Sequence, residues 1–213
     1  MRDWLWLEVK RLLPPVPAKR VWGLAGLILP MLALSLLPAN VLDLLTLNVT
    51  EPKLGAFWGA HFIHLTKQHL LMNVAGFMVI WLLTVAFVPL RWVFGLTLLL
   101  PPMVSALLIY SSDNDAIASY RGFSGILYGY WICGMVWSWS QQRLVALGCL
   151  VVMVGKIVIE QRPDFDLGYL QDSIGGLVAV DAHLWGAVAG AMLTAAFVAV
   201  DKIREKKVSS EQA

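Results

Sequence analysis

The sequence predicts an all-α membrane protein, a bundle of six transmembrane helices, from its composition and from the lengths of its apolar runs. Of the 213 residues, 59% are hydrophobic and only 14% are Asp, Glu, Lys or Arg, and the mean hydropathy is +0.71. A soluble domain is usually about 45–50% apolar and about 25% charged. One soluble core cannot bury this excess, so we expect a lipid bilayer to solvate much of the surface. The composition excludes a soluble cytosolic enzyme, a disordered regulator and a secreted disulfide scaffold.

Six apolar runs have the length of roughly 17–25 residues with which a helix crosses the hydrocarbon core. They cover residues 21–37, 69–88, 92–110, 123–139, 144–160 and 180–200. The first run contains Pro30, a kink that helices in lipid tolerate. The membrane domain therefore spans residues 21–200.

The two ends of the chain have a different composition from the spans. Residues 1–20 mix Trp and Leu with Arg, Lys and Glu, which predicts an amphipathic helix lying in the cytoplasmic interface and ended by Pro14 and Pro15. A cleavable signal peptide would place its apolar run nearer Met1, so we expect the first span to be retained. Residues 201–213 form a basic and polar cytoplasmic tail, and we expect its last six residues to be disordered.

The distribution of basic residues predicts how the spans face. Eleven of the 16 Lys and Arg residues lie in the two tails and in the short turns at Arg91 and Arg143, which an even number of spans places on one side. The positive-inside rule assigns this side to the cytoplasm, with both termini. The longer connections, roughly 38–68, 111–122 and 160–179, then lie outside. A net charge of +2 is too small to suggest a nucleic-acid partner.

Polar side chains at membrane depth are costly and are by default functional candidates. Ser124 opens the fourth span in a Gly-Phe-Ser-Gly sequence, and His183 lies near the start of the sixth. His69 and Asn73 begin the second span, four residues apart and so on one helical face. The predicted topology places all four side chains at the outer end of their helices.

These residue types are suited to acyl transfer. A serine hydroxyl becomes a useful nucleophile when an adjacent base takes its proton, and histidine does this well near neutral pH. The backbone amide of Ser124, with the side chains of Asn73 and His69, would stabilise an oxyanion.

Four glycines would support this site. Gly122 and Gly125 flank Ser124 and leave its hydroxyl unobstructed. Gly186 and Gly190 form a small-xxx-small pair on the face of His183, a pattern that favours close helix contact. We therefore expect the fourth and sixth spans to bring Ser124 and His183 together.

In this arrangement the chain resembles the rhomboid intramembrane serine proteases over about residues 55–200. The motifs that carry the resemblance are His69-x-x-x-Asn73, Gly122-x-Ser124-Gly125 and Ala182-His183-x-x-Gly186, on spans two, four and six. The resemblance implies a six-helix rhomboid-like bundle that uses a Ser124–His183 dyad without a third carboxylate and without a metal or cofactor. It also implies membrane-anchored protein substrates and a place in the bacterial inner membrane.

Within this family the chain looks most like the rhombosortase branch of small bacterial rhomboids, whose pattern is Gly-x-Ser-Gly-x-Leu-x-Gly. Residues 122–129 read Gly-Phe-Ser-Gly-Ile-Leu-Tyr-Gly, with Tyr128 where that branch leads us to expect His. The Trp-Arg pair of many bacterial rhomboids is absent, because Gly59 follows Trp58. The branch implies cleavage near a C-terminal Gly-Gly motif that precedes a membrane helix and a basic cluster.

Several other polar residues have simpler interpretations. His61 and His64 are interpreted as residues that orient the first outer connection, because that stretch offers too few ligands for a metal. Lys156 and Glu160, four residues apart near the outer end of span five, are interpreted as a snorkelling pair. Asp181 is interpreted as an interface charge.

Two other functions remain open from the sequence. A non-catalytic rhomboid-like protein would bind transmembrane helices, although such relatives usually lose the serine or the histidine, and this chain keeps both. A small transporter would favour inverted repeats and paired intramembrane charges, and the sequence has neither feature.

Overall fold

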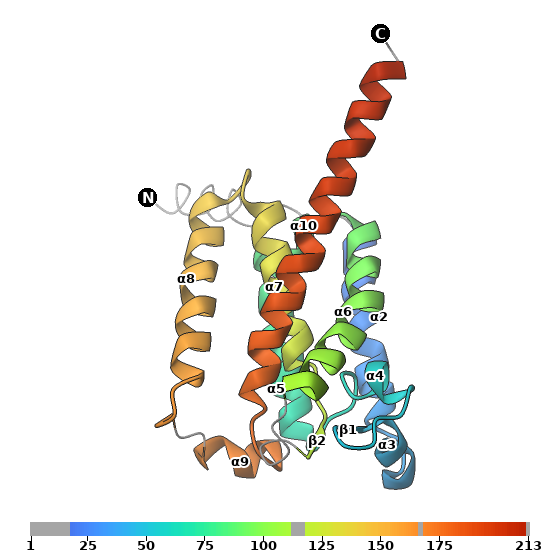
Figure 1. The fold of residues 1–213 in the computed structure, drawn as a ribbon, viewed down its shortest axis with the longest axis vertical. Helices are drawn as coiled ribbons and strands as arrows, with labels where there is room; N and C mark the ends of the chain where they lie inside the picture. The colour runs from blue at the N-terminus through green and yellow to red at the C-terminus, as the bar shows by residue number, and fades with distance from the viewer. Residues whose placement is uncertain (1–17, 112–117, 166–167, 212–213) are drawn as a thin grey trace.

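The computed structural model describes residues 18–111, 118–165 and 168–211, and it is mostly helical (76%). Six long helices form the bundle in Figure 1: α2 (Ala18–Leu34), α5 (Lys67–Leu83), α6 (Leu90–Ser111), α7 (Ser124–Ser138), α8 (Arg143–Glu160) and α10 (Val180–Glu211). The connections hold α3 (Ala39–Leu45), β1 (Leu47–Asn48), α4 (Ala56–Gly59), η1 (Val85–Phe87), β2 (Ser119–Tyr120) and α9 (Gly168–Ile174).

Each long helix coincides with one of the predicted apolar runs. Among the described residues, α6 and α10 are the two helices long and apolar enough to cross a membrane by length and composition, and α2 and α5 are shorter apolar helices. Helix α2 is displaced by three residues from the predicted run 21–37, and two other ends also differ from prediction. The run at 69–88 is interrupted at Thr84, which separates α5 from η1, and α10 continues well beyond residue 200.

The predicted disorder of the last six residues is wrong for those that the structure describes, because α10 continues to Glu211. This extension projects from the bundle in Figure 1. Most of its residues are good helix formers, and Lys207 lies 4.0 Å from Glu211, four residues on, which supports a solvated helix. The predicted interfacial helix over residues 1–20 falls almost entirely outside the described residues, although α2 already begins at Ala18.

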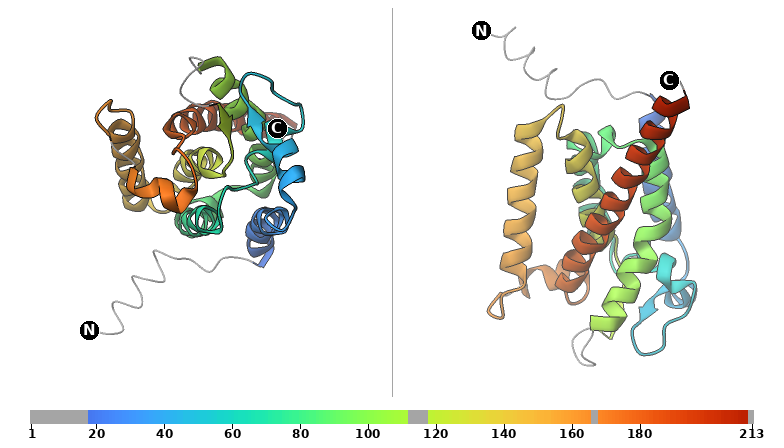
Figure 2. Two further views of the ribbon diagram at one scale, coloured as in Figure 1. Left: turned by 90° about the horizontal axis from the view of Figure 1, so that it is seen from below. Right: turned by 45° about the horizontal axis from the view of Figure 1, so that its top comes forward.

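Helix α7 occupies the centre of the bundle, and α8 lies at its edge. α7 contacts α5, α6, α8 and α10, and it is buried on most of its circumference, as expected of a helix that is apolar all round. In α8 the buried residues are Ala146, Met153 and Glu160, seven positions apart, so that one face alone meets the bundle. Figures 1 and 2 show α8 standing at the periphery.

The close contact predicted between the fourth and sixth spans is present between α7 and α10. A Cβ atom at Gly186 would overlap the carbonyl oxygen of Gly125, and one at Gly190 would overlap Gly129. Glycine at these positions therefore lets the two backbones touch at two points about one helical turn apart.

A short sheet that the sequence analysis did not anticipate ties the first outer connection to the start of α7. β1 and β2 pair antiparallel, with Leu47 opposite Tyr120. Next to β2, Arg121 donates to Thr46 Oγ1 at 2.6 Å and to Asp43 Oδ1 at 2.5 Å. The amide of Gly122 donates to the carbonyl of Ala60 at 2.9 Å. These contacts hold the segment that leads into Ser124.

Candidate active site

The four predicted site residues lie at one end of the bundle. α5, α7 and α10 begin there and α8 ends there, beside α9 and the β1–β2 pair, at the lower end of Figure 1. Ser124 is the first residue of α7 and is half-buried, whereas His69, Asn73 and His183 are buried. The fold therefore gathers at one depth side chains from three separate helices.

Gly122 brings the α5 side chains against the segment that carries Ser124. Its φ of 138° lies in the region that favours glycine. A Cβ atom at this position would lie 2.8 Å from His69 Cε1 and 3.8 Å from Asn73 Nδ2. His69 and Asn73 thus pack against Gly122, two residues before Ser124.

The start of α5 is fixed by its N-cap. Thr66 accepts a hydrogen bond from the backbone N–H of His69 at 3.1 Å and donates one to the carbonyl of Ser173 at 2.6 Å. The first contact satisfies a helix-start amide, and the second ties α5 to α9. Both restrict where the His69 ring lies.

Two side chains near Ser124 have buried polar atoms without a hydrogen-bond partner among the described residues. These atoms are Asn73 Nδ2 and His69 Nδ1. Most buried polar atoms in proteins have a partner, so an orphaned amide donor beside the Gly122 turn that leads to Ser124 indicates a site that binds a polar ligand. A carbonyl oxygen that gains negative charge is one such ligand.

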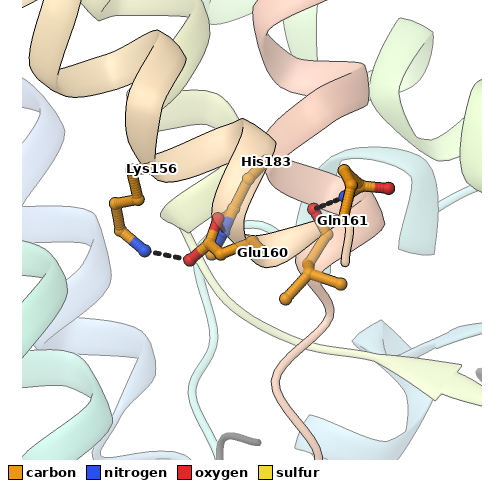
Figure 3. Close-up of polar contacts among 5 residues, drawn as sticks. Lys156, Glu160, Gln161 and His183 are labelled. Atoms are coloured by element: carbon orange, nitrogen blue, oxygen red, sulfur yellow. Dashed lines mark hydrogen bonds and ion pairs between the residues drawn. The ribbon is translucent and has the colours of Figure 1, made fainter. Parts of the chain in front are cut away.

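His183 is held by two neighbours from two other helices. Its ring stacks on Tyr128, with centroids 4.7 Å apart and planes inclined by 15°. Its Nδ1 donates to Glu160 Oε2 at 2.8 Å; Figure 3 shows this pair beside Lys156. Because Tyr128 follows Ser124 by four residues, both side chains lie on one face of α7. The imidazole is therefore stacked on the residue that lies one helical turn along α7 from the serine.

Ser124 and His183 themselves, both described by the structure, are not joined by a hydrogen bond. The backbones around them do touch, since a Cβ atom at Gly125 would lie 2.8 Å from the carbonyl oxygen of Ala182. Nucleophile and base contacts are often long before substrate binds and tighten in the reacting complex. The Ser124–His183 dyad therefore stays a prediction, with the two residues on backbone segments that touch.

The interpretation of Lys156 and Glu160 as a snorkelling pair is right about the pairing and wrong about Glu160, which is buried. Glu160 pairs with Lys156, as the spacing suggested, but it is only 4% exposed and its second oxygen binds His183. The sequence held one usable signal: Glu160 ends span five at the membrane depth of His183. What the sequence could not show is that this side chain faces the bundle.

His61 and His64 occupy structural positions in the first outer connection. His61 Nε2 donates to Ser105 Oγ at 2.9 Å, and Ser105 in turn donates to the carbonyl of Phe57 at 3.1 Å. His64 packs edge-on against His69, with centroids 5.0 Å apart. Burial lowers the pKa of each of His61 and His64 to about 3. In the part of the chain that the structure describes, no group of three or more His, Cys, Asp or Glu side chains is placed to hold a metal ion.

Comparison of the chain with protein-family models, with curated proteins and with solved structures finds no match. Function is therefore inferred from the residues and their arrangement.

Proposed function

We propose that this protein is an intramembrane serine endopeptidase of the rhomboid type that cleaves membrane-anchored proteins near the outer face of the membrane. The observation that carries the proposal is the position of His183. Its ring is held by Glu160 of α8 and by Tyr128, which follows Ser124 by one helical turn on α7. His69 and Asn73 lie over the Gly122 turn that leads to the same serine.

In this proposal all six long helices cross a cytoplasmic membrane, with both termini in the cytoplasm. Large apolar side chains exposed on the outside of the bundle support contact with lipid. Examples are Leu71, Phe94 and Val151, which are 67%, 71% and 64% exposed. The clustering of basic residues in the tails and short turns supports the orientation.

The reaction begins when Ser124 Oγ attacks the carbonyl carbon of the scissile peptide bond while His183 takes the hydroxyl proton. The amide of Ser124 and the side chains of Asn73 and His69 stabilise the oxyanion. His183 then gives the proton to the leaving amine, and the peptide bond breaks to leave an acyl-enzyme. Water, or an acceptor amine, releases the acyl group from Ser124.

For the substrate class we propose membrane proteins with rhombosortase-type tails, a Gly-Gly motif followed by a membrane helix and a basic cluster. This part of the proposal is supported by the Gly-Phe-Ser-Gly-Ile-Leu-Tyr-Gly sequence at residues 122–129.

A fluorophosphonate probe, which reacts with activated serines, tests the proposal. The full chain in detergent is compared with Ser124→Ala and His183→Ala, and with Ser138→Ala as a control for a buried serine at the other end of α7. We expect a covalent adduct on the wild type and on Ser138→Ala, and none on the other two variants. A folded wild type that stays unlabelled, or equal labelling of Ser124→Ala, would contradict the proposal and favour a non-catalytic protein that binds transmembrane helices.

A further inference from the structure

We propose that Glu160 is a positioning residue whose carboxylate fixes the orientation and tautomer of His183, so that the site works as a Ser-His-Glu triad. This inference rests on the proposed function. It departs from the dyad that the sequence resemblance implied, because α8 contributes a third group to the site.

The rotation of α8 about its own axis points the Glu160 carboxylate into the bundle. Ala146, Met153 and Glu160 mark the face that meets the bundle, and Glu160 is its last member. The side chain of Glu160 is 1% exposed, and both of its oxygens have partners. Oε1 pairs with Lys156, and Oε2 accepts the hydrogen bond from His183 Nδ1.

The charges around Glu160 support an ionised carboxylate. A buried carboxylate is costly unless it is paired and hydrogen-bonded, and Glu160 is both. Lys156, whose side chain is 48% exposed, supplies the opposite charge from the solvent side of α8, while the imidazole binds from the bundle side. An exposed Lys156–Glu160 ion pair would not require the hydrogen bond that Glu160 also makes to His183.

An ionised carboxylate has only acceptor atoms, so His183 Nδ1 carries the ring proton. The lone pair of the neutral imidazole is then on Nε2, the atom that serves as general base in serine hydrolases of this type. Stacking on Tyr128 fixes the plane of the ring, and Glu160 fixes its rotation within that plane.

During acylation the proton of Ser124 Oγ moves to His183 Nε2, and the ring becomes a cation. The Glu160 carboxylate stabilises this cation and does not itself take the proton. When the peptide bond breaks, the Nε2 proton passes to the leaving amine. His183 thereby returns to the neutral Nδ1–H form, and Glu160 is unchanged at the end of the step.

The test compares the wild type with Glu160→Gln, and uses Asp164→Asn as a control. Asp164 is an exposed carboxylate just after α8 that pairs with Arg162. The glutamine keeps the size of the side chain but removes its charge and adds an amide donor that favours the other tautomer of His183. We expect the fluorophosphonate labelling rate to fall by about 10²–10⁴-fold in Glu160→Gln and to stay within about twofold in Asp164→Asn.

A second readout responds to the tautomer and not to activity. In detergent micelles, ¹⁵N spectra of the four histidines report which ring nitrogen carries the proton, and His183→Asn identifies the His183 signals. We expect the Nδ1–H form of His183 in the wild type and in Asp164→Asn, and its loss in Glu160→Gln. A residue that only tied α8 to α10 would leave the tautomer unchanged.

The two readouts separate this inference from the proposed function. Wild-type labelling that Glu160→Gln retains, or an unchanged His183 tautomer in that variant, would overturn the positioning role. An unlabelled wild type whose His183 tautomer depends on Glu160 would refute the protease and retain the positioning role. Should Glu160→Gln not fold, the wild-type spectrum decides, because an Nε2–H form of His183 would also overturn the inference.

Discussion

His183 Nδ1 lies 2.8 Å from Glu160 Oε2, and this hydrogen bond joins α10 to α8 across 23 positions of the chain. This contact fixes the orientation of a histidine on an otherwise apolar stretch of helix. Lys156 also pairs with this buried carboxylate, so the ion pair belongs to the same cluster as His183 and is not an isolated pair on the protein surface. The site is thus assembled from four helices, α5, α7, α8 and α10.

Replacing Asn73 by alanine should reduce catalysis without unfolding the protein. The Asn73 Nδ2 donor lies beside Gly122 and has no partner among the described residues, so its removal leaves no new orphaned group. Loss of one oxyanion donor typically costs about 10²–10³-fold in rate. We expect a fall of this size in the labelling rate of Asn73→Ala. The matched control is Met72→Ala, since Met72 is 45% exposed on another face of α5 and should leave the rate unchanged.

The ring of Tyr128, and not its hydroxyl, should matter for the site. The ring stacks on His183, whereas the hydroxyl lies near the Glu160 carboxylate without good hydrogen-bond geometry. An aromatic pair contributes about 0.5–1.5 kcal/mol beyond its buried area, so Tyr128→Ala should lower the labelling rate by about 2–10-fold or more. Tyr128→Phe keeps the stack and should label within about twofold of the wild type. Equal rates in both variants would contradict a role for the stack.

A larger side chain at Gly186 should separate α7 from α10. Any Cβ atom there would overlap the carbonyl oxygen of Gly125, next to Ser124. We expect Gly186→Val to lower the unfolding temperature in detergent and to abolish labelling. In contrast, a Cβ atom at Gly148, on the exposed face of α8, meets nothing within 4 Å. Gly148→Ala should therefore be neutral or stabilise the helix by up to about 1 kcal/mol. If Gly186→Val remained as stable and as active as Gly148→Ala, the close contact would be refuted.

The folded protein should lose stability as the pH falls below about 6.5. Burial lowers the pKa of His61 to about 3, so the unfolded chain binds a proton between these values that the folded chain does not. The stability of the fold with neutral His61 is fully present above the pKa of the unfolded residue, and it is lost progressively as the pH falls from there toward the pKa of the folded residue. The loss is about 1.4 kcal/mol per pH unit for each such histidine, or about 2 kcal/mol at pH 5.

The measurement is the unfolding temperature in detergent at pH 7.5 and at pH 5. His61→Asn removes the titrating group and keeps a donor toward Ser105, the partner of His61. We expect the wild type to lose more stability between these two pH values than the variant does. An equal loss in both proteins would show that His61 is not responsible.

The sequence by itself determined the position of each long helix and the end of the bundle where His69, Asn73, Ser124 and His183 gather. It could do so because run length locates a helix and the succession of connections alternates its direction. It also located the α7–α10 contact, since Gly186 and Gly190 repeat on the face that carries His183. These features depend on local composition and on the order of elements along the chain.

Only the tertiary structure decided the partners of Glu160 and His61 and the pairing of β1 with β2. Nearly all of α8 is apolar, on the face that meets α7 as well as on the exposed face, so hydrophobic periodicity does not define its rotation. That rotation points Glu160 at His183. The His61–Ser105 bond and the pairing of Leu47 with Tyr120 join residues 44 and more positions apart. Such contacts depend on how whole elements pack, which no local pattern of residues specifies.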